Sequence, residues 1–142
     1  IFRTSDAILA EKLYLCGITA APPRKDIEKV ALGATKVVPW EYNSTSTEAL
    51  LKLKENGVKI CALELTDKSQ DYHPCQYPFP MALILGNEVE GISEDAMKFV
   101  DMAISIPMLG RANSLNVATA YGIVGYEILY QYLQYLKARS LT

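Results

Sequence analysis

The sequence predicts a single α/β domain that spans residues 1–142 and is built on an open, mostly parallel β-sheet with helices on both faces. Segments typical of strands alternate with segments typical of helices, a pattern that produces parallel sheets. Residues 58–65 and 81–85 are almost continuously apolar, as expected of strands that are buried on both faces. The chain has 142 residues, of which 50% are hydrophobic, and no internal repeat or linker is visible, so one domain with a real core is expected.

The first half of the chain is predicted to contain three helices and two short strands. The expected helices are residues 2–10, 24–32 and 47–55, and the expected strands are residues 12–17 and 36–39. Gly33 marks the end of the second helix, because helices commonly stop at a glycine. Thr45 and Glu48 form the capping-box pattern that starts the third helix.

The second half is predicted to contain three strands, two helices and one long loop. The expected strands are residues 58–65, 81–85 and 102–106, and the expected helices are residues 94–100 and 114–137. Ser93 is placed to cap the first of these helices. Residues 66–80 are polar and contain proline, which predicts a loop that serves as a lid or contact region, with His73 as a solvated loop residue.

Composition restricts the classes of function that the chain can perform. A net charge of −2 and a pI near 5.4 argue against a strong electrostatic grip on nucleic acid, although local basic groups can still contact phosphates. The chain has an odd number of cysteines, Cys16, Cys61 and Cys75, and no Cys-x-x-Cys pair. We therefore expect free thiols and a cytoplasmic location. His73 is the only histidine, which excludes a histidine-rich metal site, and we expect no metal.

The last predicted helix is apolar on nearly all of its sides. A helix of this kind must be buried on more than one side, so we expect the sheet on one side and a second subunit on the other. Five of the nine tyrosines lie in this helix: Tyr121, Tyr126, Tyr130, Tyr132 and Tyr135. We interpret them as packing residues of the core or of an interface rather than as platforms for RNA bases.

Two glycine-bearing loops that follow neighbouring predicted strands are the most informative part of the sequence. Gly86 and Gly91 lie in the first loop; Pro107 and Gly110 lie in the second, which leads into the last helix at Ser114. In an open α/β sheet, loops at the carboxyl ends of the strands hold nucleotide-like ligands, and glycine allows a close approach of the backbone.

These segments resemble a known family. Its second and third motifs are matched by Gly86-x-Glu88-x-x-Gly91, Ile106-Pro107-Met108-x-Gly110 and Ser114-Leu115-Asn116-Val117. The family is the SpoU (TrmH-like) branch of the SPOUT-class RNA 2′-O-ribose methyltransferases. Arg3-Thr4, followed by Asp6-Ala7, is similar to the second half of its first motif. The asparagine of that motif would precede residue 1, so we expect that an N-terminal strand is missing.

The resemblance implies a fold, a cofactor and partners. The implied fold has a trefoil knot near the C-terminus, and the implied partners are structured tRNA or rRNA and a second copy bound through the C-terminal helix and knot region. The implied cofactor is S-adenosylmethionine, whose adenine faces would meet apolar side chains beside the glycines. The expected cofactor-binding residues are Leu85, Gly86, Glu88, Gly91, Ile106, Met108, Gly110 and Leu115.

The resemblance also implies roles in catalysis and RNA binding. We expect Arg3 to stabilise the alkoxide that develops on a ribose 2′-oxygen and to grip a neighbouring phosphate, because guanidinium is a donor rather than a base. Asn116 either orients the reacting groups or caps the last helix, with Ser114 the more natural cap. Glu88 is expected to order its loop by accepting backbone N–H bonds, and Arg111 to contact RNA phosphate.

Two alternatives remain open at the level of sequence. One is a related enzyme that methylates an RNA base. Arg3-Thr4 and the segment 114–117 make this alternative less favoured. The other is a non-catalytic protein of the same fold that binds an adenosyl group or RNA, which the acidic pI keeps open.

Overall fold

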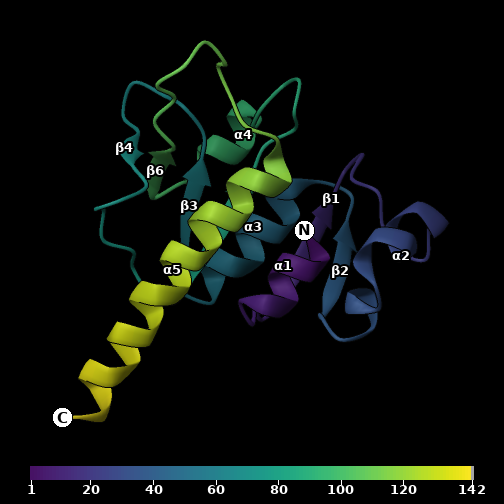
Figure 1. Ribbon diagram of the computed structural model, residues 1–142, viewed down its shortest axis with the longest axis horizontal. Helices are drawn as coiled ribbons and strands as arrows, with labels where there is room; N and C mark the ends of the chain where they lie inside the picture. The colour runs from purple at the N-terminus through teal and green to yellow at the C-terminus, as the bar shows by residue number, and fades with distance from the viewer. Residues whose placement is uncertain (142) are drawn as a thin grey trace.

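The computed structural model describes residues 1–141, and its larger β-sheet consists of four parallel strands (Figure 1). These strands are β3 (Lys59–Leu63), β4 (Gln70–Asp71), β5 (Met81–Leu85) and β6 (Met102–Ser105), and they are ordered β4-β6-β3-β5. The central strand β3 pairs in register on both sides, with Leu63 opposite Leu85 of β5 and opposite Ile104 of β6. The carboxyl ends of these three strands therefore lie at one edge of the sheet.

A second sheet pairs β1 (Leu13–Cys16) in parallel with β2 (Trp40–Asn43). In Figure 1 the two strands lie on the far side of β3 from β4 and β6, and the arrows of β1, β2 and β3 point the same way. The strand order puts β5 on the side of β3 that faces this second sheet. Within residues 1–141 no ladder joins the two sheets, so β1 and β5 each keep an unpaired edge.

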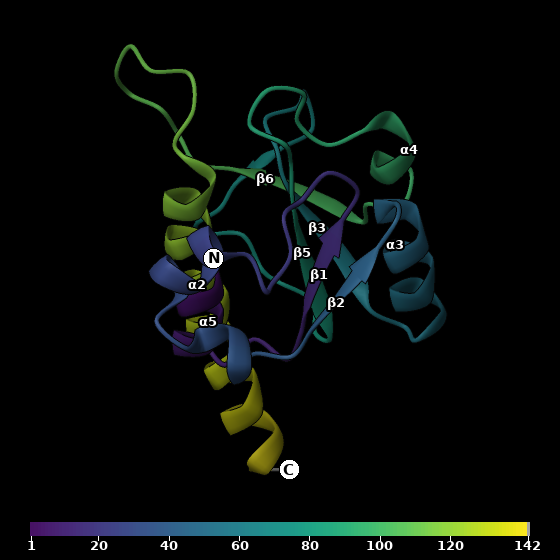
Figure 2. The same cartoon turned by 90° about the vertical axis from the view of Figure 1, so that its right-hand side faces the viewer.

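Helices cover both faces of the strands, as the sequence predicted. Figure 2 shows α1 (Phe2–Ala7), α2 (Lys25–Ala31) and α5 (Val117–Ser140) on one side, and α3 (Ser46–Glu55) and α4 (Glu94–Met97) on the other. The parallel α/β architecture is thus confirmed. No helix in the described part of the chain is both long and apolar enough to cross a membrane.

The core divides between the two faces of β3 because successive side chains of a strand point in opposite directions. Ile60 is fully buried in a cluster with Leu50 of α3 and Ala96 of α4. Its neighbour Cys61 is fully buried on the other face, in a cluster with Ile104 and with Val124 of α5. Burial of each large aliphatic side chain contributes about 1.5–3 kcal/mol, so these clusters fix the sheet between its helices.

The strand predicted at residues 36–39 is wrong. A 3₁₀ turn occupies Ala34–Lys36, and β2 begins afterwards, at Trp40. The ladder with β1 starts where Leu13 N–H donates to the carbonyl of Pro39. Proline has no N–H of its own, so it stands at the entrance of the strand rather than at its end.

Several other boundaries differ from prediction. Helix α1 ends at Ala7 rather than at residue 10, because Leu9 takes a left-handed conformation with φ of 55°. Helix α4 ends at Met97, and α5 begins at Val117 rather than at Ser114. The segment 66–80 contains the short strand β4, which pairs with β6.

The segment after β4 is anchored to α5 rather than free to act as a lid. Gln131 donates to the carbonyl of Cys75 (2.8 Å) and accepts from the N–H of Tyr77 (3.1 Å). Both anchored residues are buried. The His73 side chain is 63% exposed, as predicted for a loop residue, and its Nδ1 lies 3.2 Å from the carboxylate of Glu127.

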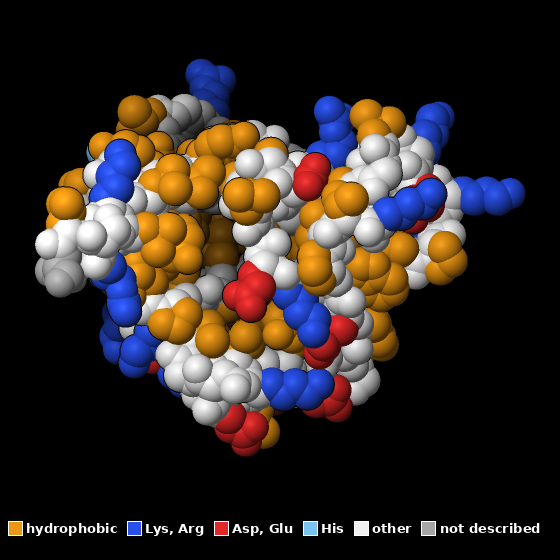
Figure 3. Space-filling model, turned by 90° about the horizontal axis from the view of Figure 1, so that it is seen from below, with side chains coloured by type: hydrophobic (Ala, Val, Ile, Leu, Met, Phe, Trp, Pro, Cys, Tyr) orange, Lys and Arg blue, Asp and Glu red, His pale blue; other side chains and the backbone are white. Residues whose placement is uncertain are grey.

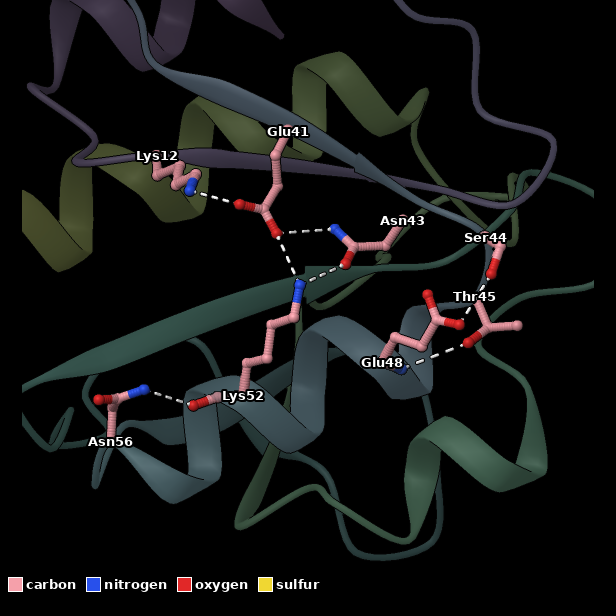
Figure 4. Close-up of polar contacts among 8 residues, drawn as sticks. All are labelled: Lys12, Glu41, Asn43, Ser44, Thr45, Glu48, Lys52 and Asn56. Carbon is pink, nitrogen blue, oxygen red and sulfur yellow. Dashed lines mark hydrogen bonds and ion pairs between the residues drawn. The ribbon is translucent and has the colours of Figure 1, made fainter.

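A polar network fastens the second sheet to α3 (Figure 4). Glu41 of β2 accepts from Lys12, Asn43 and Lys52, and these hydrogen bonds lower its pKa to about 2. At the start of α3 the Thr45 hydroxyl accepts from the N–H of Glu48 (3.3 Å), which confirms the predicted N-cap.

Candidate functional site

The two glycine-bearing loops lie at the carboxyl ends of β5 and β6, the strands on either side of β3. Residues 86–93 follow β5 and lead into α4, and residues 106–116 follow β6 and lead into α5. The Asn116 side-chain amide donates to the Glu88 carboxylate at 3.3 Å and so connects the two loops. The structure therefore brings together residues from the two segments that the sequence singled out.

The loop after β5 folds back tightly on itself. Asn87 and Gly91 exchange two backbone hydrogen bonds of 3.0 and 2.9 Å. A Cβ atom on Gly86 would lie 2.6 Å from the carbonyl carbon of Gly91, and Gly91 itself has φ of 71°. Both glycines are therefore required by the packing of the loop itself, whether or not a ligand is bound.

The carboxylate of Glu88 does not order this loop in the way that the sequence suggested. The side chain of Asn87 accepts the backbone N–H bonds, from Val89 at 2.8 Å and from Glu90 at 3.2 Å. Glu88 is exposed and directed to Asn116. Sequence reasoning missed Asn87, although an asparagine that starts a turn is a recognised signal for such bonds.

Asn116 performs the capping role that the sequence left as one of two alternatives. Its Oδ1 accepts from the N–H of Ala118 at 2.9 Å, which makes it the N-cap of α5. The expectation that Ser114 is the cap is wrong, because the N-cap lies two residues further along the chain, at Asn116, and the helix begins at Val117. The same amide uses its Nδ2 to hold Glu88, so capping and loop coupling coexist.

Replacing Asn116 should separate these two roles. We expect Asn116→Ala to lower the free energy of unfolding by about 1 kcal/mol, because the N–H of Ala118 loses its acceptor. Asn116→Ser should restore most of that stability, since serine caps well, but cannot reach Glu88. Urea denaturation followed by circular dichroism measures both. Equal loss of stability in the two variants would contradict the capping role.

Apolar side chains accompany the loops, as the sequence predicted. Leu85, Ile106 and Met108 are half-buried, and Leu115 is 37% exposed. A Cβ at Gly110 would meet nothing within 4 Å, so the backbone is open there. Half-exposed apolar side chains beside accessible backbone fit an adenosyl group, whose base has two apolar faces and a polar edge.

Arg3 is exposed on α1. It lines two shallow pockets. The first lies between α1 and α5 and is also lined by Ile1, Thr4, Ala7, Gly122 and Tyr126. The second lies between α1 and the segment that follows α2 and is also lined by Asp6, Ala31, Leu32, Gly33, Ala34 and Val37. Helix α1 is held on α5 by a buried 2.9 Å hydrogen bond between Ser5 and Tyr121. Gly122 is six residues after Asn116, or about 9 Å along the helix axis. No hydrogen bond or ion pair within residues 1–141 joins Arg3 to either loop.

Arg111, the other predicted RNA contact, is exposed in the loop after β6.

A further acidic residue, Glu64, lies between the loops and was not predicted. Glu64 directly follows β3, and its Oε2 accepts from the N–H of Ile92 at 3.2 Å. The available sequence signal was an acidic residue near the end of a predicted, largely apolar strand, residues 58–65. No group of three His, Cys, Asp or Glu residues in the described chain is placed to hold a metal.

The fold and the two loops define an open α/β protein with a candidate ligand site at the carboxyl ends of parallel strands. The sequence profile of the SpoU rRNA Methylase family matches residues 1–126. The chain therefore belongs to this family, the SpoU branch of the SPOUT class.

Individual relatives support the assignment. The tRNA (guanosine(18)-2′-O)-methyltransferase of Aquifex aeolicus is 37% identical over 128 residues, which cover 89% of this chain and 60% of the relative. The crystal structure of the A. aeolicus TrmH/SpoU tRNA modifying enzyme matches with a TM-score of 0.83 and 33% identity, over 94% of this chain and 67% of that one. An AdoMet-bound rRNA methyltransferase from Sinorhizobium meliloti matches with a TM-score of 0.80 and 30% identity, over 89% of this chain and 48% of that one. The chain thus spans only part of the proteins that it matches.

Proposed function

We propose that this chain transfers a methyl group from S-adenosylmethionine to a ribose 2′-hydroxyl of tRNA or rRNA. The observation that carries the proposal is the junction of the two motif loops by Asn116 and Glu88 at the carboxyl ends of β5 and β6. The matched relatives are named as 2′-O-methyltransferases of tRNA and rRNA, and a matched structure contains AdoMet.

The proposed chemistry assigns separate tasks to separate residues. S-adenosylmethionine supplies an electrophilic methyl group on a sulfonium, which moves to the ribose oxygen as the S–CH₃ bond breaks. Leu85, Ile106, Met108 and Leu115, with the backbone at Gly86, Gly91 and Gly110, hold the adenosyl part. Arg3 stabilises the developing negative charge on the ribose oxygen, and the proton leaves to water or phosphate. Arg111 binds an RNA phosphate and so positions the substrate.

We further propose that the chain works as a homodimer through α5 and the neighbouring knot region. The C-terminal half of α5 projects from the body of the protein (Figure 1). Figure 3 shows hydrophobic side chains over much of the face around this end, with a hollow near the middle. Five large apolar residues of α5 are at least 40% exposed: Tyr126, Tyr130, Tyr132, Leu133 and Leu136. A second copy would cover apolar area that a monomer leaves in water.

Leu133→Glu should test this interface. Leu133 is 47% exposed in the single chain, so the charge should leave the fold intact and disfavour only association. We expect sedimentation velocity to show a dimer for the unmodified protein and a dissociation constant at least about tenfold higher for the variant. Leu51→Glu, on the exposed side of α3, is the matched control and should remain dimeric. A monomeric unmodified protein would refute the proposal.

We also infer that residues 1–142 form one domain whose sheet accepts a further strand between β1 and β5. Both strands have an unpaired edge, and all five residues of the apolar strand β5 are only half-buried. A parallel strand from a longer form of the chain would satisfy both edges. Amides of β5 should then exchange with solvent more slowly in an N-terminally extended protein than in residues 1–142. Equal exchange would contradict this inference.

The trefoil knot is likewise proposed, on the basis of family membership and of the bond between the two loops. Pulling the two ends of the unfolded chain in an optical trap would tighten a knot and leave the chain shorter than its full contour length. Full extension would exclude the knot.

A cytoplasmic location is proposed because Cys16, Cys61 and Cys75 are all free thiols, which suit a reducing compartment.

The decisive experiment is transfer of tritiated methyl from S-adenosylmethionine to unmodified tRNA and rRNA, using both this chain and an N-terminally extended form. Nuclease digestion then identifies the labelled nucleoside. A 2′-O-methyl nucleoside is the expected product. A methylated base would favour a base methyltransferase. No incorporation, together with calorimetric binding of the cofactor, would favour a non-catalytic binding protein.

A further inference from the structure

Glu64 occupies the central position of the proposed cofactor site. It directly follows β3, the strand between β5 and β6, and its backbone N–H donates to the carbonyl of Ile104 at 3.0 Å. Its backbone is thereby fixed to β6, which leads into one loop. Its side chain reaches the other loop, where Oε2 accepts from the N–H of Ile92. Glu64 is therefore hydrogen-bonded both to β6, which leads into one motif loop, and to Ile92 of the other motif loop.

The position of the carboxylate is set by the absence of a side chain on Gly91. A Cβ atom on Gly91 would lie 3.0 Å from Oε2 and 3.2 Å from Oε1 of Glu64, so both oxygens lie directly beside this glycine. The side chain is half-buried and remains accessible. Within residues 1–141 only Oε2 receives a hydrogen bond, which leaves Oε1 available as an acceptor. An ionised carboxylate has about four acceptor positions in all.

The chemistry around Glu64 restricts what it can bind. The residues proposed above to hold the adenosyl group, Leu85, Ile106, Met108 and Leu115, suit the faces of adenine, to which a carboxylate contributes nothing. The ribose attached to adenine carries two adjacent hydroxyls, and each can donate to a carboxylate. An acidic side chain beside a glycine-bearing loop at the ends of parallel strands is an arrangement that recognises ribose hydroxyls.

We propose that Glu64 binds the ribose hydroxyls of the adenosyl cofactor through its carboxylate while Gly91 provides the room for it. This inference rests on the proposed function, because it requires an adenosyl group between the two loops. It assigns Glu64 to cofactor recognition and not to the methyl-transfer step.

The test is calorimetric binding of S-adenosylhomocysteine and of its 2′-deoxy and 3′-deoxy analogues to the unmodified protein and to Glu64→Gln. Glutamine keeps an oxygen that can accept from Ile92 N–H, so the loop should stay in place, and an unchanged melting temperature would verify this. We expect Glu64→Gln to bind S-adenosylhomocysteine about tenfold more weakly, as for loss of hydrogen bonds to a charged acceptor. The unmodified protein should reject at least one deoxy analogue by a similar factor, and the variant should largely lose this discrimination.

Two controls make the result specific. Asp67→Asn removes the same charge from an exposed site three residues further on and should change affinity less than about twofold. 5′-Methylthioadenosine keeps the ribose but lacks the amino-acid part, so Glu64→Gln should weaken its binding by the same factor. A loss seen with S-adenosylhomocysteine but not with methylthioadenosine would assign Glu64 to the ammonium group and overturn the proposal. Equal discrimination by both proteins would overturn it too, whereas no binding to the unmodified protein would refute the proposed function itself.

Discussion

Gly86→Ala should destabilise the protein by about 1–3 kcal/mol and abolish measurable cofactor binding. The added Cβ would lie 2.6 Å from the carbonyl carbon of Gly91 and 2.8 Å from the backbone nitrogen of Ile92. Because these are backbone atoms of a doubly hydrogen-bonded turn, they cannot move aside without opening the loop, and overpacking of this kind has that cost. Urea denaturation and calorimetry with S-adenosylhomocysteine measure the two effects.

Gly110→Ala is the matched control for stability. A Cβ at Gly110 would meet nothing within 4 Å, so we expect its free energy of unfolding to stay within about 0.5 kcal/mol of the unmodified value. Its effect on cofactor binding is a separate measurement, since Gly110 belongs to the proposed site. If Gly86→Ala proved as stable as Gly110→Ala, the close packing of Gly86 on Gly91 would be refuted.

Arg3→Ala should reduce methyl transfer by about 10²-fold or more while leaving stability nearly unchanged. Arg3 is exposed on α1, so its removal exposes no core residue. Loss of a single group that stabilises transition-state charge has an effect of this size. Single-turnover transfer of tritiated methyl to RNA measures the rate, and thermal unfolding measures the stability.

Two further variants, Arg3→Lys and Lys29→Ala, show why Arg3→Ala loses methyl-transfer activity. Lysine keeps the charge but not the two-pronged donor geometry, so Arg3→Lys should also be strongly impaired. Lys29→Ala removes an exposed positive charge from α2 and should retain most of the activity. Near-normal turnover by Arg3→Lys would show that the geometry of the guanidinium is unnecessary and would contradict the proposed role.

Local patterns in the sequence were sufficient for most elements. The apolar runs at β3 and β5 and the capping patterns at Thr45 and Ser93 predicted strands and helix starts that the structure contains. Two of the errors arose where a single residue reverses the local preference. Pro39 opens β2 instead of closing a strand, and Leu9 ends α1 early by adopting a positive φ. Neither effect has a periodic signal that sequence reasoning could detect.

The class of this protein can be read from the amino-acid sequence alone. The glycines and polar residues at the ends of two strands, together with Ser114–Val117, identify the family without coordinates. How these residues are used depends on the three-dimensional fold. It placed Asn116 on Glu88 and Glu64 on Ile92, and it held α1, which carries Arg3, on α5 through the Ser5–Tyr121 bond. These contacts join residues that are distant along the chain. Their geometry follows from the register of the sheet and the packing of α5, which no local pattern encodes.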